Sequence, residues 1–521
     1  MPRSRTEKAP FPAKGAGLSR WTRRGWLAAA GAALACGGRA VAAPGGTVTF
    51  AYPADVLSWD PTARITPLAT AITESVFDNA LQMSPDLKLL PGVANWRWRD
   101  NGARQLELTF REDVLFHNGD RLTAEDFQFT YFDRLRADPT LQLAANWNPY
   151  LEKIEVESAT RAVMHFKSPM AWAPVLLAEM GEAVLPKKYM LRAGAAGFLA
   201  KPVGSGPYRL VDYQRNSRVV LEAWPRYWGG PARIRQVMFQ IIPDATARGT
   251  AVQGSQADIT INLSARETQR LGALPGLAGE IHPTTSVLLL HMANRGPFTD
   301  RRLRLAAHHA IDKAALSRAF FGGQSRALSM LSPPGTPAHD AKFNFTYDLG
   351  AAQALVKQAG FSPQKPVKVK LFTTNGAYAS DFDIARAIVQ MWKRAGIDAD
   401  LKVVTLPEYL LLSQGNKFEG PALWNWYTKT GSPVAYGYIL DPRTIFSVWK
   451  SPDVAARFAA LEQEADYAKM TRAYGDLEKW AVSEGYTMPL LQGIMPVVHG
   501  KALKYAPFGN GSNRPYYWSA T

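Results

Sequence analysis

Residues 90–135 read LPGVANWRWRDNGARQLELTFREDVLFHNGDRLTAEDFQFTYFDRL. Within them, QLELTFR alternates apolar and polar residues, as a half-buried strand does. Asn118-Gly119-Asp120 predicts a tight turn in which the glycine supplies a positive φ. Thr123, followed by Glu125 and Asp126, predicts a helix start, because acids in the first turn complement the helix dipole. The stretch therefore predicts a strand, a turn and a helix in succession. The expected core residues are Phe116, Phe127 and Phe129.

The same mixture of strands and helices continues along the chain, so the pattern predicts an α/β fold. The clearest unit is a strand over 367–374, an amphipathic helix over 381–397 and a strand over 398–406, which is typical of a crossover between parallel strands. The other expected strands are 47–53, 105–111, 162–168, 218–224, 236–243 and 487–500. The other expected helices are 69–81, 123–137 and 300–323, with two more over 451–482. Helices are concentrated in the second half.

Length and composition indicate a globular protein of two or three domains. The chain has 521 residues, of which 47% are hydrophobic and 20% are charged. Lys and Arg residues are spread along the chain without a basic run or a zinc-finger spacing, so nucleic-acid binding is not expected. Histidines do not form an H-E-x-x-H pattern, and we expect neither a metal site nor a cofactor.

The N-terminus has the layout of a secretory signal peptide: a basic start, a short apolar run and then small residues. Thr22-Arg23-Arg24-Gly25-Trp26-Leu27 resembles a twin-arginine signal. Ala40-Val41-Ala42 is an A-x-A site, and we expect cleavage after Ala42. The leader holds eight of the 60 Lys/Arg and one of the 44 Asp/Glu residues, which leaves 52 and 43 and a net charge of +9. Lipid anchoring at Cys36, the single cysteine, is disfavoured because no leucine stands three residues before it.

Enzyme motifs are sparse, but one combination is kept as an alternative. Ser447-Val448-Trp449-Lys450 and Ser362-Pro363-Gln364-Lys365 fit S-x-x-K, and Lys429-Thr430-Gly431 fits K-T-G. Together they are similar to the boxes of penicillin-binding serine acyl-transfer enzymes. The nucleophilic serine of those enzymes opens a helix, whereas neither serine here lies at a predicted helix start. The expectation is therefore that the protein is not an enzyme.

Several collinear segments resemble family 5 of the bacterial extracellular solute-binding proteins, the peptide-, dipeptide- and nickel-binding type that serves ABC importers. The resemblance begins with FHNGD and LTAEDF inside residues 90–135. It continues through GSGPYRLVDYQRNSRVVLEAWPRYWGG, IIPDATARGTAVQGSQADI, HMANRGPFTDRRLRLAAHHAIDKAAL and MPLLQG. These matches cover nearly the whole of the expected mature chain.

The resemblance implies a periplasmic-binding-protein clamp of class II type, with two lobes joined by hinge strands and closing by hinge motion. The implied domains are a leader over 1–42, a first lobe over 43–285 with an inserted extra domain at about 60–200, a second lobe over 286–484, and a return to the first lobe over 485–521. It also implies a periplasmic monomer that captures a small solute and delivers it to ABC permease subunits in the inner membrane.

Residues 423–433, LWNWYTKTGSP, bear on the solute. Peptide-binding members of the family carry W-x-x-D here, and the aspartate pairs with the peptide's α-ammonium. Aligning on Trp426 and Gly431-Ser432-Pro433 puts Lys429 at the position of that aspartate. A lysine would repel an ammonium in a water-poor cleft. The sequence thus predicts a solute that is not an ordinary peptide bound by its N-terminus. A conventional oligopeptide-binding protein remains the alternative.

Two interpretations of Lys429 remain open. In the first, it pairs with a carboxylate or phosphate of an opine-like or modified-peptide solute, and Trp424, Trp426 and Tyr427 pack on the rest of that solute. In the second, Lys429 is a surface residue or is satisfied by a neighbouring protein acid. The complete set of candidate ligand-binding residues is Lys429, Trp426, Trp424, Tyr427, Thr428, Tyr52, Trp59, Asn294, Thr374 and Asn375.

Overall fold

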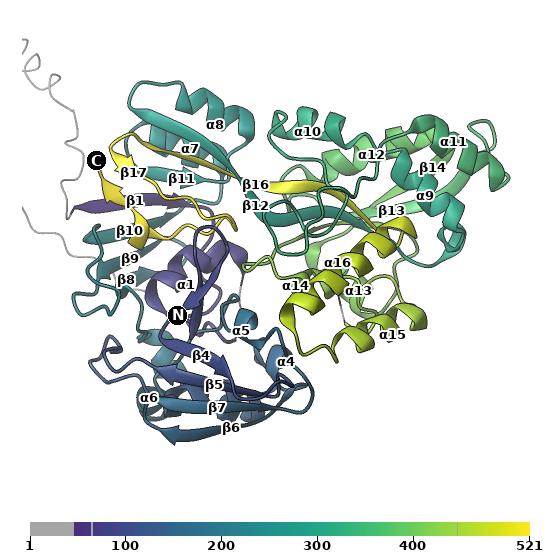
Figure 1. Cartoon of the computed structure of the whole chain (residues 1–521). Helices are drawn as coiled ribbons and strands as arrows, with labels where there is room; N and C mark the ends of the chain where they lie inside the picture. Colours follow the sequence, from purple (N-terminus) through teal and green to yellow (C-terminus); the bar gives the residue numbers. More distant parts are fainter. Residues whose placement is uncertain (1–45, 64–65, 445) are drawn as a thin grey trace, which may run out of the picture. The chain divides into compact units, whose positions relative to one another are not determined.

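The computed structural model describes residues 46–63, 66–444 and 446–521 as a mixed α/β structure (Figure 1). Within that part, ten strands form one sheet in the order β14-β13-β15-β12-β16-β11-β1-β10-β9-β8. Their bounds are β1 (Thr47–Tyr52), β8 (Tyr208–Gln214), β9 (Arg218–Ala223), β10 (Gln236–Ile241), β11 (Ile259–Ile261), β12 (Leu277–His291), β13 (Val367–Thr373), β14 (Ile397–Val403), β15 (Ala422–Trp426) and β16 (Thr487–Gly500). The predicted leader, its cleavage site and Cys36 lie outside the described residues.

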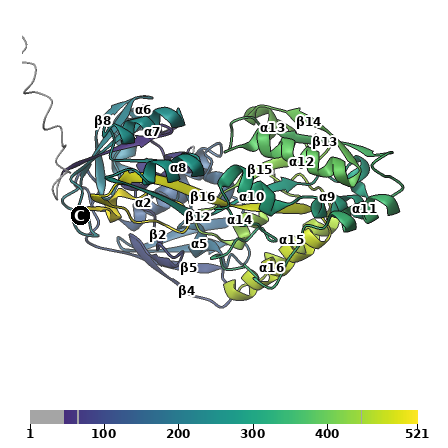
Figure 2. The same ribbon diagram turned by 90° about the horizontal axis from the view of Figure 1, so that it is seen from above.

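Two long antiparallel strands, β12 and β16, join the two ends of this sheet (Figure 2). At one end β16 pairs with β11, and at the other end β12 pairs with β15. Between Pro283 and Val287 the register shifts, since proline has no N–H to donate. Opposite this irregularity lies Gly493, where a Cβ would stand 1.7 Å from the hydroxyl of Ser286. Strands from the first part, the middle and the last part of the chain therefore share one sheet.

A second sheet, of four antiparallel strands in the order β4-β5-β7-β6, contains part of the stretch 90–135. Its strands are β4 (Ala94–Trp98), β5 (Gln105–Phe110), β6 (Leu151–Ser158) and β7 (Arg161–Phe166). The short strands β2 (Leu81–Met83) and β3 (Leu89–Pro91) form one pair, and β17 (Leu503–Lys504) and β18 (Ser519–Ala520) form another. One continuous apolar core links residues of the four-stranded sheet with residues of β12, β13 and β16.

Helices lie mainly in the second half, as the sequence predicts. The α-helices are α1 (Thr70–Val76), α2 (Ala124–Gln128), α3 (Arg134–Ala137), α4 (Ala144–Trp147), α5 (Ala173–Leu176), α6 (Lys187–Ala200), α7 (Ala245–Gln253), α8 (Ala265–Gly272), α9 (Arg301–His309), α10 (Lys313–Phe321), α11 (Leu349–Gln358), α12 (Asp381–Ala395), α13 (Leu406–Gln414), α14 (Pro433–Gly437), α15 (Pro452–Leu461) and α16 (Tyr467–Ser483). The short 3-10 helices are η1 (Pro67–Ala69), η3 (Gly296–Thr299) and η4 (Pro515–Tyr517), and η2 (Phe129–Asp133) is a π-helical turn. None of these helices is long and apolar enough to cross a membrane.

The stretch 90–135 forms the elements that its sequence predicts. Gly119 has φ +91°, and Thr123 and Asp126 form a capping box at the start of α2. Phe116, Phe127 and Phe129 are buried. The crossover is also confirmed, because β13 and β14 pair in parallel and α12 connects them.

One expectation is wrong. The predicted helix over 300–323 is two helices, α9 and α10, because Asp312 caps the start of α10 by accepting from the N–H of Ala315. Arg304, on α9, is buried. Its guanidinium donates to the carbonyl oxygens of Phe298 and Glu484 and compensates the lost hydration in that way.

The segment Gly204-Ser205-Gly206 packs directly on the backbone at the end of α1. A Cβ on Gly204 would stand 2.0 Å from the carbonyl oxygen of Val76, and one on Gly206 would stand 2.6 Å from its carbonyl carbon. The hydroxyl of Ser205 donates to Asp78, which also accepts from Tyr227 and Trp228. Asp78 therefore ties three distant segments together.

We expect Gly204→Ala to destabilise the fold by at least about 2 kcal/mol, since a backbone atom cannot yield to the added methyl group. Gly350→Ala is the control, because Gly350 is exposed in the first turn of α11 and a Cβ there meets no backbone atom. Urea denaturation measures the free energy of unfolding of both variants. Equal unfolding free energies for the two variants would contradict the close packing.

Asp78 predicts a pH dependence of stability. Burial raises the pKa of Asp78 to about 7, against the opposing effect of its three donors. The unfolded carboxyl ionises near pH 4, so between about pH 4 and 7 the folded state binds the extra proton and the free energy of unfolding falls as pH rises. In denaturation at pH 4.5, 6 and 8, the free energy of unfolding should fall by a few kcal/mol in total, and Asp78→Asn should make this fall smaller. It should not remove the fall, because burial also raises the pKa of Glu478 to about 7. Asp383→Asn, at an exposed carboxylate, should leave the fall unchanged. Parallel profiles for wild type and Asp78→Asn would refute this.

Candidate functional site

Lys429 lies three residues beyond the end of β15 and is 2% exposed. Its Nζ is 3.0 Å from Oε1 of Glu74, which lies on α1. Of the two interpretations left open, the structure thus has the one in which a neighbouring protein acid satisfies the lysine. This ion pair joins segments 355 residues apart in sequence.

Arg514, just before η4, contacts the same carboxylate from the other side, with its Nε 3.0 Å from Oε2 of Glu74. We call Glu74, Lys429 and Arg514 the Glu74 cluster. Burial alone would raise the pKa of Glu74, but the charges of Lys429 and Arg514 outweigh burial and hold that pKa below its usual value. The cluster combines two cations with one anion, and the nearby negative charge of Glu179 also acts on Lys429, opposing the lowering of its pKa by burial.

Glu179, three residues after α5, fixes the loop that presents Lys429. Its carboxylate accepts from the N–H of Lys429 at 2.8 Å, the hydroxyl of Thr428 at 3.0 Å and the hydroxyl of Thr430 at 2.9 Å. The side-chain amide of Asn510 donates to the carbonyl oxygen of Lys429 at 2.8 Å. The loop is therefore held from two other segments by hydrogen bonds, independently of its ion pair.

The aromatic residues around this loop pack in several directions. Trp424 stacks on Tyr409 with ring centroids 4.2 Å apart. Trp426 donates from Nε1 to the carbonyl oxygen of Ala435 and packs edge-on against Phe446. Burial raises the pKa of Tyr427, and the negative charge of Glu74 raises it further, so this phenol stays protonated.

The remaining predicted site residues are dispersed. Tyr52 is buried in the core around β1, where Glu74 adds to the effect of burial in raising its pKa. Trp59 packs edge-on against Tyr213. Asn294 donates to the carbonyl oxygen of Lys450, and Thr374 donates to Asp381. Asn375 is exposed.

Sequence reasoning missed Glu74, Glu179, Asn510 and Arg514. Glu74 occupies an ordinary position in the helical pattern of residues 69–81, and Glu179 and Arg514 lie in segments without a recognisable motif. Their roles follow from chain crossings that bring these segments together, and local sequence does not report such crossings.

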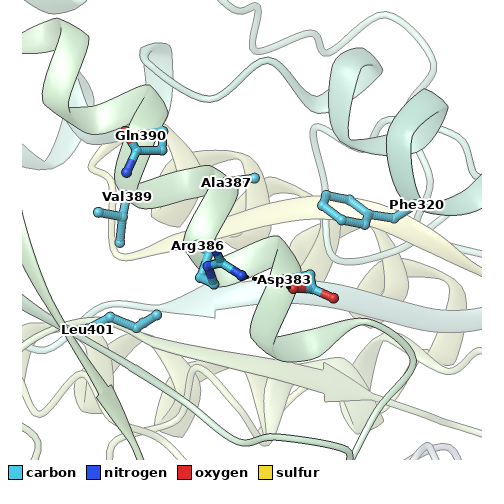
Figure 3. Close-up of a pocket in the computed structure, with 7 residues that line it drawn as sticks. All are labelled: Phe320, Asp383, Arg386, Ala387, Val389, Gln390 and Leu401. Carbon is cyan, nitrogen blue, oxygen red and sulfur yellow. Dashed lines mark ion pairs between the residues drawn. The ribbon is translucent and has the colours of Figure 1, made fainter.

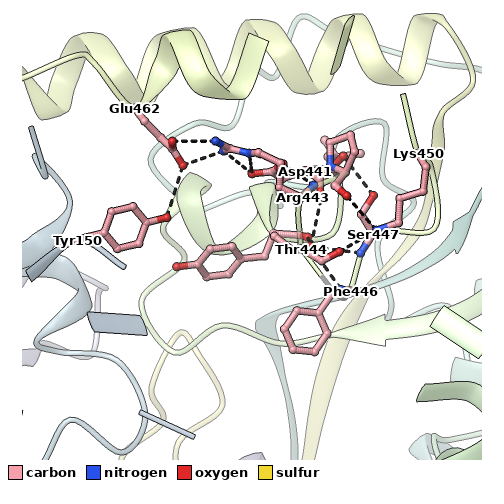
Figure 4. Close-up of polar contacts among 11 residues, drawn as sticks. Tyr150, Asp441, Arg443, Thr444, Phe446, Ser447, Lys450 and Glu462 are labelled. Carbon is pink, nitrogen blue, oxygen red and sulfur yellow. Dashed lines mark hydrogen bonds and ion pairs between the residues drawn. The ribbon is translucent and has the colours of Figure 1, made fainter. Parts of the chain in front are cut away.

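The S-x-x-K patterns do not build a nucleophile. The hydroxyl of Ser447 donates to the carbonyl oxygens of Leu440 and Trp449, and Nζ of Lys450 donates to those of Pro442 and Thr444 (Figure 4). Ser362 and Lys365 close a tight turn by hydrogen bonding each other's backbone. Lys429, of the K-T-G pattern, is engaged by Glu74. Among the described residues there is also no group of His, Cys, Asp and Glu side chains suited to a metal ion.

A second polar contact joins the four-stranded sheet region to the second half of the chain. The hydroxyl of Tyr150 donates to Glu462 at 3.4 Å, and Glu462 also pairs with Arg443, which is held by Asp441 (Figure 4). With the contacts of Glu74 and Glu179, this gives three places where an acidic side chain links the first 180 residues to the second half of the chain.

Two cavities lie in different places. A groove of about 460 Å³ lies between α10 and α12 and is lined by Phe320, Asp383, Arg386, Ala387, Val389, Gln390 and Leu401 (Figure 3). It shares no lining residue with the Glu74 cluster. The other cavity, of about 20 Å³, borders Glu74, and Ser58, Thr66, Thr70 and Thr73 are among its lining residues. It has room for one water molecule and polar partners for it.

Comparison with known proteins agrees with this architecture. The family profile described as bacterial extracellular solute-binding proteins, family 5, matches residues 88–445. The chain is 25% identical over 410 residues to the dipeptide-binding protein of Escherichia coli K12, covering 73% of each chain, and 25% identical over 350 residues to the nickel-binding periplasmic protein of the same organism, covering 64% of each.

Solved structures show the same fold. A periplasmic binding protein from Helicobacter pylori, in complex with the peptide STSA, superimposes with a TM-score of 0.78 at 21% identity, covering 92% of this chain and 98% of that one. An ABC transporter substrate-binding protein from Listeria monocytogenes gives 0.80 at 18% identity, covering 92% and 100%. The α/β structure described above is thus the two-lobed fold predicted from the sequence, and the chain belongs to the bacterial extracellular solute-binding proteins, family 5.

Proposed function

We propose that this protein captures an anionic small solute between its two lobes and delivers it to the permease of an ABC importer in the inner membrane. The family membership supports the transport role, since family 5 proteins work with ABC permeases and bind small ligands. The relatives bear names such as dipeptide-, glutathione- and nickel-binding protein, so the family accommodates chemically different solutes.

The observation behind the choice of an anion is that two cations, Lys429 and Arg514, converge on one carboxylate. A solute ammonium at this place would approach Lys429 and Arg514, with a single carboxylate already shared by both. Two unit charges of the same sign 4 Å apart repel each other by about 4 kcal/mol at an effective dielectric constant of 20. A carboxylate or phosphate would instead be attracted, and its charge-assisted hydrogen bonds are strong ones.

We further propose that the lobes divide as the sequence suggests, with 43–285 and 485–521 in the first lobe and 286–484 in the second. In this division Glu74, Glu179 and Arg514 belong to the first lobe and Lys429 to the second. The ion pair of Lys429 then spans the cleft, where a solute would bind. Export by the twin-arginine-type leader would place the protein, as a monomer, in the periplasm, where its relatives work.

A ligand panel tests the solute class. We expect calorimetric titration to give no binding of tri-alanine and measurable binding of an opine-like dicarboxylate or a sugar phosphate. Lys429→Ala should weaken anion binding about tenfold or more, since one charge-assisted contact contributes about 1.5–3 kcal/mol. Lys402→Ala is the matched control, because Lys402 is a partly exposed lysine paired with Asp400 on β14. Tight binding of tri-alanine that Lys429→Ala leaves unchanged would exclude the proposed solute class and favour a conventional oligopeptide-binding protein.

The geometry around the S-x-x-K patterns predicts no acyl transfer. A fluorescent penicillin should leave the folded protein unlabelled, because Ser447 is buried and its hydroxyl donates to backbone carbonyl oxygens. Gel fluorescence and peptide mass spectrometry measure the labelling. Labelling that Ser447→Ala or Ser362→Ala abolishes would show that the protein is an enzyme.

A further inference from the structure

Glu74 differs from the other buried carboxylates near the site in how it is held. Glu179 accepts hydrogen bonds from the loop at Thr428, Lys429 and Thr430, and Asp78 accepts three from Ser205, Tyr227 and Trp228. Among the described residues, the oxygens of Glu74 are contacted by the side chains of Lys429 and Arg514 and by no backbone N–H or hydroxyl group. Its ion-pair contacts with Lys429 and Arg514 hold it in place.

A small cavity of about 20 Å³ borders the side chain of Glu74, and Ser58, Thr66, Thr70 and Thr73 are among the residues that line it. The hydroxyls of Thr70 and Thr73 donate to the carbonyl oxygens of Pro67 and Ala69, which leaves Ser58 and Thr66 as possible donors to a carboxylate that rotates this way. Glu74 is thus a carboxylate that two cations hold beside a small polar cavity.

The two cations need an anion between them. Lys429 and Arg514 are both nearly buried, with side-chain exposures of 2% and 12%, and without Glu74 they would lose the carboxylate that pairs with both of them. Any carboxylate or phosphate oxygen pair placed between Nζ of Lys429 and Nε of Arg514 would replace it. The position that Glu74 fills is therefore an anion subsite by its chemistry, whichever molecule provides the anion.

We infer that Glu74 is a resident carboxylate in an anion subsite formed by Lys429 and Arg514, and that the anionic group of the solute displaces it. This inference rests on the proposed function for the origin of the displacing anion. In the empty protein, Glu74 keeps two cations compensated. On binding, the solute's carboxylate or phosphate takes its place, and Glu74 turns toward the side of the cavity that Ser58 and Thr66 line. Glu74 therefore competes with the solute and lowers its affinity.

Chemical rescue tests the subsite without a known solute. Glu74→Ala deletes four heavy atoms, the same number as in acetate. We expect this variant to unfold at a lower temperature than wild type, and acetate to raise its melting temperature by about 2 °C or more. Acetamide, which has the same shape without the charge, should not do so at the same concentration. In Glu74→Ala/Lys429→Met the acetate effect should be lost. Equal effects of acetate and acetamide, or an undiminished acetate effect in the double variant, would overturn the subsite.

Glu74→Gln keeps the shape of the side chain and removes its charge. It is the second variant to test if Glu74→Ala does not fold. With inorganic phosphate and acetate as separate probes, we expect calorimetry to give at least about fivefold tighter binding of one of them to Glu74→Gln than to wild type. The probe whose affinity increases more identifies the class of anion. Equal or weaker binding of both probes would refute competition by Glu74. This result is independent of the tri-alanine titration, so failure of the proposed function and failure of this inference remain distinguishable.

Discussion

A buried lysine ammonium is the constraint on which the candidate site depends. Removing such a charge from water costs several kcal/mol, and the structure stays stable only where opposite charge and hydrogen bonds compensate that cost. For Lys429 the compensating charge comes from Glu74, and the position of the ammonium comes from Glu179 and Asn510, which hold the backbone on both sides of the residue. The protein thus contributes three separate segments to place one cation.

The two glutamates are held in different ways: Glu179 by hydrogen bonds to the loop, and Glu74 by its ion pairs with Lys429 and Arg514. Glu179 accepts several hydrogen bonds from the loop at 428–430, so it fixes the backbone position from which the lysine side chain extends. Glu74 is held by Lys429 and Arg514, and an incoming anion that pairs with both cations would offset the loss of these contacts. In the mechanism we infer, a fixed pair of cations and an exchangeable anion recognise negatively charged solutes in a fold whose relatives include dipeptide-binding proteins.

Local sequence was sufficient for the elements whose signal is local. The turn at Gly119, the capping box of Thr123 and Asp126, and the crossover through α12 follow from residue types within a few positions of one another. The prediction of a single helix over 300–323 is wrong. The helical spacing of apolar residues continues on both sides of Asp312, but Asp312 caps the start of a new helix. The local sequence marks Lys429 as unusual, because a lysine stands where the family motif has an aspartate. It could not identify Glu74 or Arg514, since their contact depends on the packing of α1 and the C-terminal segment on each other.

The most direct test of the central claim, that the cluster around Lys429 selects an anionic solute, is the mass of whatever ligand stays bound when the protein is purified from a host that exports it. Native mass spectrometry followed by denaturation would release and identify this ligand. We expect a molecule that carries a carboxylate or phosphate group and whose binding does not depend on a free peptide N-terminus. An unmodified di- or oligopeptide in stoichiometric amount would contradict it.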